Sequence, residues 1–180
     1  MKYFTATELD GLRTQHLTEW FANVKSDPTQ AKLSVFLSHS HKDRPLVEGL
    51  IRYFAKQGIT IYVDWNDGAM PRVTDRETAA KLKKRIDTCS VFMVLATPNA
   101  IDSKWVPWEV GVADQMKGEE RITVIPVADA SGRYAGAEYL QLYRRFGKSD
   151  YSDSPWLFEA QKDNLSVGLG DYFKRFAKPY

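Results

Sequence analysis

Trp105 and Glu109 are the residues whose types and spacing most directly suggest a chemical site. They stand four apart in the segment Trp105-Val106-Pro107-Trp108-Glu109. Residues four apart share one face of a helix, so this segment would place an indole ring beside a carboxylate. Pro107 fits the first turn of such a helix, where its missing N–H costs least. The alternative interpretation of Glu109 is a surface carboxylate that interacts favourably with the helix dipole.

The elements that must position this pair alternate between strands and helices. Apolar, β-branched runs predict four strands, at residues 33–37, 59–63, 90–96 and 122–127. One helix is expected after Asp43, which could cap it, and a second after Thr74 or Asp75. A third helix is expected to end at Lys117. This alternation predicts βαβ units and a mostly parallel sheet with helices on both faces. Glu109 would then lie near the carboxyl end of a strand, where open α/β sheets bind ligands.

The two ends of the chain are predicted in less detail. An amphipathic helix is expected over residues 7–24, and it either packs on the outside of the domain or binds a partner. We therefore divide the chain into a helical extension, 1–30, and a main domain, 31–180. Towards the C-terminus, the pattern indicates four features in chain order: a short helix or strand at 139–143, a polar loop at 148–155, a strand at 156–158 and a helix at 167–177.

Composition and absent motifs exclude several functions. The formal net charge of +2 is spread over mixed charges, which does not suggest a nucleic-acid partner. We expect a cytoplasmic protein, since the chain lacks a signal-peptide pattern and a membrane-spanning run. A single cysteine excludes an intramolecular disulfide, and the phosphate-binding glycine motifs are missing. His39 and His41 have no obvious third ligand nearby, so no metal site is predicted.

Three segments together resemble the Toll/interleukin-1 receptor (TIR) domain family. The segment from Val35 to Asp43 resembles the first sequence box of the family, and 58–64 is similar to its second strand. The strand 91–95 followed by Trp105-x-x-x-Glu109 resembles the third strand and the W-x-x-x-E signature. The resemblance implies a flavodoxin-like α/β fold, here with an extra N-terminal helix.

The resemblance also implies a site. Catalytic family members cleave the bond between nicotinamide and ribose in NAD+, so Glu109 is the expected catalytic residue and NAD+ the substrate. No cofactor and no metal are expected. The substrate contacts implied by the resemblance are Ser38, His39, Ser40, Asp64, Trp65 and Trp105. Trp108 is expected in the core.

Two departures from the family pattern concern these contacts. The box-one position usually held by Tyr or Phe is His39, and the next position, often Arg, is Ser40. The loop after the second strand has Gly68-Ala69-Met70-Pro71 where the family has Arg-x-x-Pro-Gly.

The expected activity is that of an NAD+ glycohydrolase or ADP-ribosyl cyclase. The layout resembles the stand-alone bacterial members that produce a cyclic ADP-ribose signal in Thoeris antiphage systems. This implies self-association through the loop Trp65–Pro71 and a separate effector protein that responds to the product. Two alternatives remain open: a non-catalytic TIR scaffold that acts by protein–protein contacts, and an enzyme similar to nucleoside deoxyribosyltransferases.

Overall fold

The fold is built around a mixed β-sheet. The computed structural model describes residues 2–13, 33–57, 59–63, 75–148 and 155–177. Eight strands are assigned within these ranges: β1 Phe4–Thr5, β2 Ser34–Ser38, β3 Thr60–Tyr62, β4 Val91–Ala96, β5 Ile122–Ala128, β6 Arg144–Lys148, β7 Pro155–Glu159 and β8 Lys162–Gly168. The order across the sheet is β3-β2-β4-β5-β6-β7-β8, and β1 pairs with β5.

The first five strands of this order run parallel, and the last two are antiparallel additions. Every residue of β2, β4 and β5 is buried. That burial explains their near-continuous apolar sequences, because parallel strands are covered on both faces. The parallel register brings the carboxyl ends of β2, β4 and β5 to one edge of the sheet. This arrangement confirms the predicted mostly parallel, flavodoxin-like sheet.

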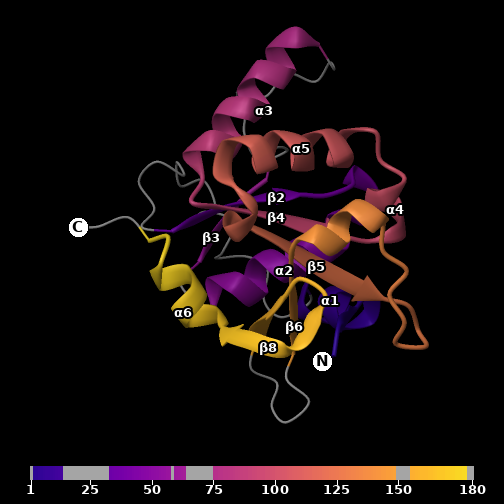
Figure 1. The fold of residues 1–180 in the computed structure, drawn as a ribbon. Coiled ribbons are helices and arrows are strands. Elements are labelled where there is room, and N and C mark those ends of the chain that lie inside the picture. The colour runs from indigo at the N-terminus through magenta and orange to yellow at the C-terminus, as the bar shows by residue number, and fades with distance from the viewer. Residues whose placement is uncertain (1, 14–32, 58, 64–74, 149–154, 178–180) are drawn as a thin grey trace.

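Helices cover both faces of the sheet, as predicted. Figure 1 shows α3 and α5 over one face and α1, α2 and α6 over the other. The α-helices within the described residues are α1 Ala6–Arg13, α2 Arg44–Ala55, α3 Arg76–Thr88, α4 Pro98–Ile101, α5 Trp105–Lys117 and α6 Leu169–Lys174. Three 3₁₀ helices join them: η1 His41–Asp43, η3 Glu119–Arg121 and η4 Glu138–Leu142. None of these helices is long and apolar enough to span a membrane.

The N-terminal segment joins the same core as the rest of the chain. β1 pairs in parallel with the end of β5, and Phe4 and Leu9 are fully buried beside residues of α2. The predicted helix 7–24 begins at Ala6 and is described as far as Arg13. Its remainder and the boundary at residue 30 lie outside the described residues, so the division into 1–30 and 31–180 stays a prediction.

The C-terminal third differs most from the expectation. The segment expected as a short helix or strand at 139–143 is the 3₁₀ helix Glu138–Leu142, and the predicted strand at 156–158 is confirmed as β7. β6 and β8 were not predicted. The helix expected at 167–177 begins instead at Leu169, because Val167 and Gly168 pair with β7 as the end of β8. The predicted loop 148–155 starts and ends in strands, and residues 149–154 lie outside the described residues.

Helix α5 is fixed at both ends, which matters because it carries the predicted catalytic residue. At its start, the Ser103 hydroxyl accepts hydrogen bonds from the backbone N–H groups of Trp105 and Val106. At its end, Lys117 donates to the carbonyl oxygens of Asp87 and Cys89, and burial lowers the pKa of this lysine. Gly118 then leaves the helix with a φ of 74°, a conformation that favours glycine.

Candidate active site

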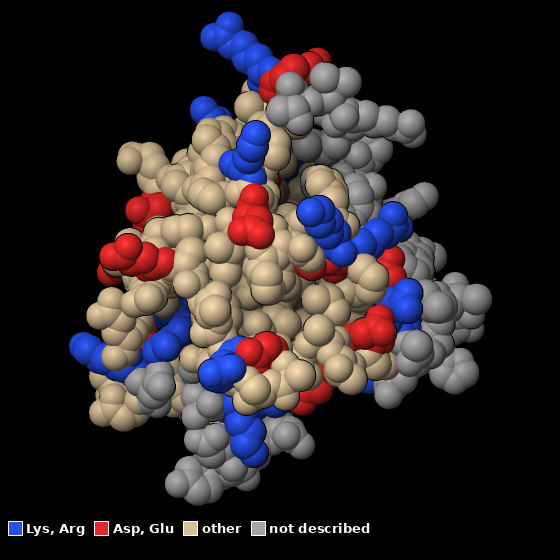
Figure 2. All heavy atoms as spheres, turned by 90° about the vertical axis from the view of Figure 1, so that its right-hand side faces the viewer, with Lys and Arg blue, Asp and Glu red and all other residues tan. Residues whose placement is uncertain are grey.

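The candidate site lies at the edge of the sheet where the parallel strands end. Ser38 is the last residue of β2, and Thr97 follows the last residue of β4. Figure 2 views the side of the molecule towards which β5 points in Figure 1, and basic and acidic side chains are interspersed there among uncharged ones. The charges drawn in colour therefore form no basic stripe of the kind that nucleic-acid binding requires.

Ser38 and Glu109 meet at this edge. The Ser38 hydroxyl donates a hydrogen bond of 2.5 Å to Oε2 of Glu109. Ser38 is 1% exposed and Glu109 is 8% exposed. The two predicted site residues are thus brought together from a strand and a helix, and the interpretation of Glu109 as an ordinary surface carboxylate is wrong. A carboxylate withdrawn from water interacts strongly with any positive charge that develops beside it.

Trp105 lies one helical turn before Glu109, in the first turn of α5. Its ring meets that of Trp108 edge to face, with centroids 5.2 Å apart and an interplanar angle of 89°. Both rings are partly buried against the core cluster on the α3 and α5 face. The Lys83 ammonium lies 5.8 Å from the Trp108 ring centroid. The two indoles are therefore both partly buried, and burial does not decide which of them contacts the substrate. The assignment of Trp105 to the substrate stays a prediction.

His39 and Ser40 follow β2 directly and are bound to their own loop. Nδ1 of His39 lies 2.8 Å from the carbonyl oxygen of Leu37, and the Ser40 hydroxyl accepts from the backbone N–H of Lys42 at 3.4 Å. The rings of His39 and His41 lie edge to face, with centroids 6.0 Å apart. In the described part of the chain, no group of three His, Cys, Asp or Glu side chains could hold a metal ion.

Asp43 joins the loop after β2 to the segment after β4 by hydrogen bonds, a role that the sequence did not predict. Asp43 was expected to cap α2, but its side chain makes no capping hydrogen bond. Its carboxylate instead accepts from the Thr97 hydroxyl at 2.5 Å and from Nδ2 of Asn99 at 2.6 Å. Asp43 is buried, so these bonds offset the cost of withdrawing it from water. No local pattern signals this contact, because its partners stand 54 and 56 positions from Asp43.

Two predicted substrate contacts, Asp64 and Trp65, lie outside the described residues, as does the loop Trp65–Pro71. At this edge, the structure therefore brings together side chains from the end of β2, the segments after β2 and β4, and the start of α5.

The described fold and site define a doubly wound α/β protein with a buried serine–carboxylate pair at the carboxyl edge of its parallel strands. The chain belongs to the TIR domain family, whose sequence model matches residues 35–160. This match contains every residue of the site described above.

Two relatives show how the chain compares with known proteins. It is 34% identical over 136 residues to the probable 3' cyclic ADP-D-ribose synthase ThsB' of Bacillus cereus (strain MSX-D12), covering 71% of this chain and 69% of the relative. It is 32% identical over 98 residues to the putative cyclic ADP-D-ribose synthase TIR2 of Cytobacillus dafuensis, covering 52% of this chain. That second alignment spans 26% of the relative, so most of that protein lies outside the aligned region.

Proposed function

We propose that the chain cleaves NAD+ between nicotinamide and ribose and closes the ADP-ribose into a cyclic product, with Glu109 as the catalytic carboxylate. The observation that carries the proposal is the buried hydrogen bond of 2.5 Å between Ser38 and Glu109 at the carboxyl edge of the parallel strands of a TIR domain. The relatives named as cyclic ADP-D-ribose synthases support the same reaction.

The reaction needs little beyond a well-placed negative charge. The bond between nicotinamide and ribose breaks with its electron pair leaving on nicotinamide, which departs neutral. The ribose carbon left behind becomes oxocarbenium-like, as in glycoside hydrolysis, and the Glu109 carboxylate stabilises that charge. Capture of the carbon by a nucleophile of the same molecule, which then loses its proton, gives a cyclic product. Capture by water gives linear ADP-ribose.

Ser38 is a positioning residue in this proposal. Its hydroxyl donates to Oε2 of Glu109 and so orients the carboxylate towards the substrate. Because Ser38 ends a central strand and is buried, it fixes the carboxylate relative to the sheet. A carboxylate fixed before substrate arrives loses little free energy to reorganisation during the reaction.

The remaining predicted contacts complete the proposed site. Trp105 would stack on a ring of the substrate, and His39 and Ser40 would offer polar contacts from the loop after β2. Asp64 and Trp65 are proposed to approach from the second-strand loop. We further propose that the loop Trp65–Pro71 mediates self-association, that a separate effector responds to the product, and that the protein acts in the cytoplasm in antiphage defence.

Product analysis tests the proposed reaction. The purified chain is incubated with NAD+ over a range of protein concentrations, and products are identified by mass spectrometry. We expect nicotinamide together with a species one water lighter than ADP-ribose, and a specific activity that rises with protein concentration if protomers complete each other's site. Nicotinamide with linear ADP-ribose alone would reduce the proposal to a glycohydrolase. An absence of turnover at every concentration would favour the scaffold alternative.

A further inference from the structure

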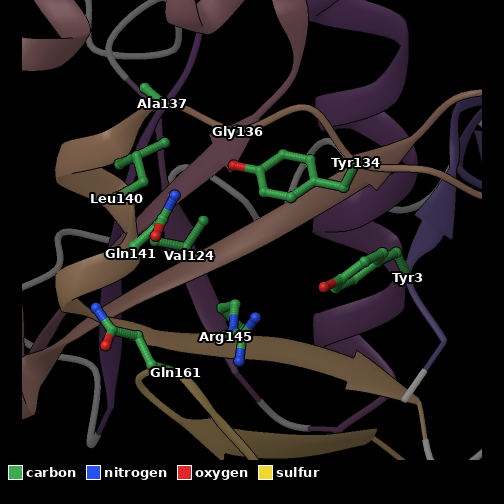
Figure 3. Close-up of a pocket in the computed structure, with 9 residues that line it drawn as sticks. All are labelled: Tyr3, Val124, Tyr134, Gly136, Ala137, Leu140, Gln141, Arg145 and Gln161. Atoms are coloured by element: carbon green, nitrogen blue, oxygen red, sulfur yellow. The ribbon is translucent and has the colours of Figure 1, made fainter.

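A pocket that neither Ser38 nor Glu109 lines lies beside β5 and β6. Its volume is about 530 Å³, within the range typical of small-molecule sites. Figure 3 shows the nine residues that line it, and none of them belongs to the candidate active site: Tyr3, Val124, Tyr134, Gly136, Ala137, Leu140, Gln141, Arg145 and Gln161. They come from the segment before β1, from β5 and β6, from η4 and the loop before it, and from the turn between β7 and β8.

Tyr134 is the feature of this pocket that most directly indicates a ligand. Its hydroxyl is buried and makes no hydrogen bond to any residue that the structure describes. A Cβ atom on Gly136 would come within 2.5 to 2.7 Å of the tip of the Tyr134 ring, so the ring can lie there only because residue 136 is glycine. Buried hydroxyls in proteins normally have a partner, and one without a partner calls for an explanation. A ligand oxygen beside this hydroxyl would supply the missing bond.

The groups around Tyr134 favour an anionic ligand. Burial raises the pKa of Tyr134, with further contributions from Tyr139 and Tyr3, so the phenol keeps its proton and remains a donor. Arg145 lines the same pocket, and its positive charge acts in the opposite direction on that pKa. No Asp or Glu is among the nine lining residues. Arginine is suited to bind carboxylate or phosphate oxygens.

The other walls favour a flat ring. Val124 and Leu140 provide apolar surface, and the ring of Tyr3 lies with its centroid 5.6 Å from that of Tyr134. In Figure 3 the two tyrosines stand on one side of the pocket, the side chains of Gln141 and Gln161 on the other, and Arg145 between them. Such amides can bind hydroxyl or ring nitrogen atoms.

We propose that this pocket is a second ligand site, which binds an anion that carries a flat ring and is no larger than a nucleotide. The anionic group, a phosphate or a carboxylate, lies between Arg145 and Tyr134, and the ring packs against Tyr3 and Leu140. This site does not depend on the reaction proposed for Glu109.

Calorimetric titration of the full chain carrying Glu109→Gln tests the proposal, because that background keeps the reaction silent. The probes are adenosine monophosphate and benzoate, with adenosine and inorganic phosphate as ligands that lack one of the two features. We expect at least one of the two ring-bearing anions to bind at millimolar concentration or below, and more tightly than both incomplete probes. Removing one hydrogen bond to the anion by Tyr134→Phe, or the charge by Arg145→Gln, should weaken binding about tenfold.

Tyr139→Phe is the matched control. The Tyr139 hydroxyl is also buried without a hydrogen bond, but Tyr139 does not line the pocket, so this variant should bind like its parent. Gly136→Ala should weaken binding because it displaces the Tyr134 ring. Two results would overturn the proposal: no probe binding up to millimolar concentration, or equal affinities in Tyr134→Phe and its parent, which would place the probe elsewhere, including at the active site. If Arg145→Gln fails to fold, the comparison of Tyr134→Phe with Tyr139→Phe still decides.

Discussion

Ser38 donates a buried hydrogen bond of 2.5 Å to the carboxylate of Glu109, across 71 positions of the sequence. The bond joins the end of a central strand to the first turns of α5. In the proposed mechanism it holds the carboxylate where positive charge develops.

Ser38→Ala tests that positioning role. The variant keeps Glu109 but removes the Ser38 hydrogen bond that orients its carboxylate, so kcat for NAD+ cleavage should fall about tenfold to a hundredfold, with KM little changed. Steady-state kinetics of nicotinamide release measures both constants. Ser34→Ala is the control, since Ser34 is equally buried at the opposite end of β2 and exchanges hydrogen bonds with Ser90. If both variants lose activity equally, the effect of Ser38→Ala is structural.

Asp43→Asn tests the contact between the loops after β2 and β4. The amide keeps one acceptor oxygen and turns the other position into a donor, so the charge-assisted bonds to Thr97 and Asn99 become weaker neutral ones. The free energy of unfolding, measured by urea denaturation, should fall by about 1–3 kcal/mol. Asp75→Asn is the control: Asp75 accepts from the backbone N–H of Thr78 as an N-cap, and asparagine caps equally well. Equal losses in the two variants would contradict this role for Asp43.

Gly49 and Gly111 form a matched pair for the packing of the N-terminal helix. Both lie inside helices, but a Cβ on Gly49 would overlap the Leu9 carbonyl oxygen, whereas one on Gly111 would meet nothing within 4 Å. Gly49→Ala should lower the free energy of unfolding by about 1–3 kcal/mol because α1 must move. Gly111→Ala should raise it by about 0.5–1 kcal/mol through helix propensity. A neutral Gly49→Ala would show that α1 does not pack closely on α2.

Tyr172 should make the fold sensitive to alkaline pH. Burial raises its pKa from the ordinary value of 10.0 to about 12, so the folded state holds this proton more tightly than the unfolded state. The stabilisation is complete below pH 10 and is lost as pH rises towards 12, at up to about 1.4 kcal/mol per pH unit. Urea unfolding at a series of pH values measures the slope. Tyr172→Phe should make it less steep, and an unchanged slope would contradict this role.

The parallel half of the sheet was predictable because burial on both faces forces long apolar runs. β2, β4 and β5 show such runs, and each turns polar where the strand ends. β8 was missed for the opposite reason: at the edge of the sheet, with Leu165 half exposed, it needs no apolar sequence. β1 has two residues, too few to establish any periodicity.

The candidate site was predictable only where its residues belong to strands and helices that the sequence pattern predicts. Ser38 ends a recognisable strand and Glu109 lies in a recognisable helix, so the predicted sheet topology was enough to bring them to one edge. The Asp43 contacts to Thr97 and Asn99 span 54 and 56 positions and leave no local pattern. By sequence Asp43 also fits an N-cap, but its carboxylate makes no capping bond and accepts from Thr97 and Asn99 instead. Such a choice between local and distant partners is settled by packing rather than by propensity.

The most direct test of the proposed reaction compares Glu109→Gln with Glu119→Gln in NAD+ turnover followed by mass spectrometry. Both changes remove one negative charge and keep the shape of the side chain, but Glu119 is exposed in η3, beyond the other end of α5. We predict that Glu119→Gln forms nicotinamide and the cyclic product as the unmodified chain does, while Glu109→Gln folds normally and forms neither. Turnover by a folded Glu109→Gln variant at a rate near that of the unmodified chain would contradict the account.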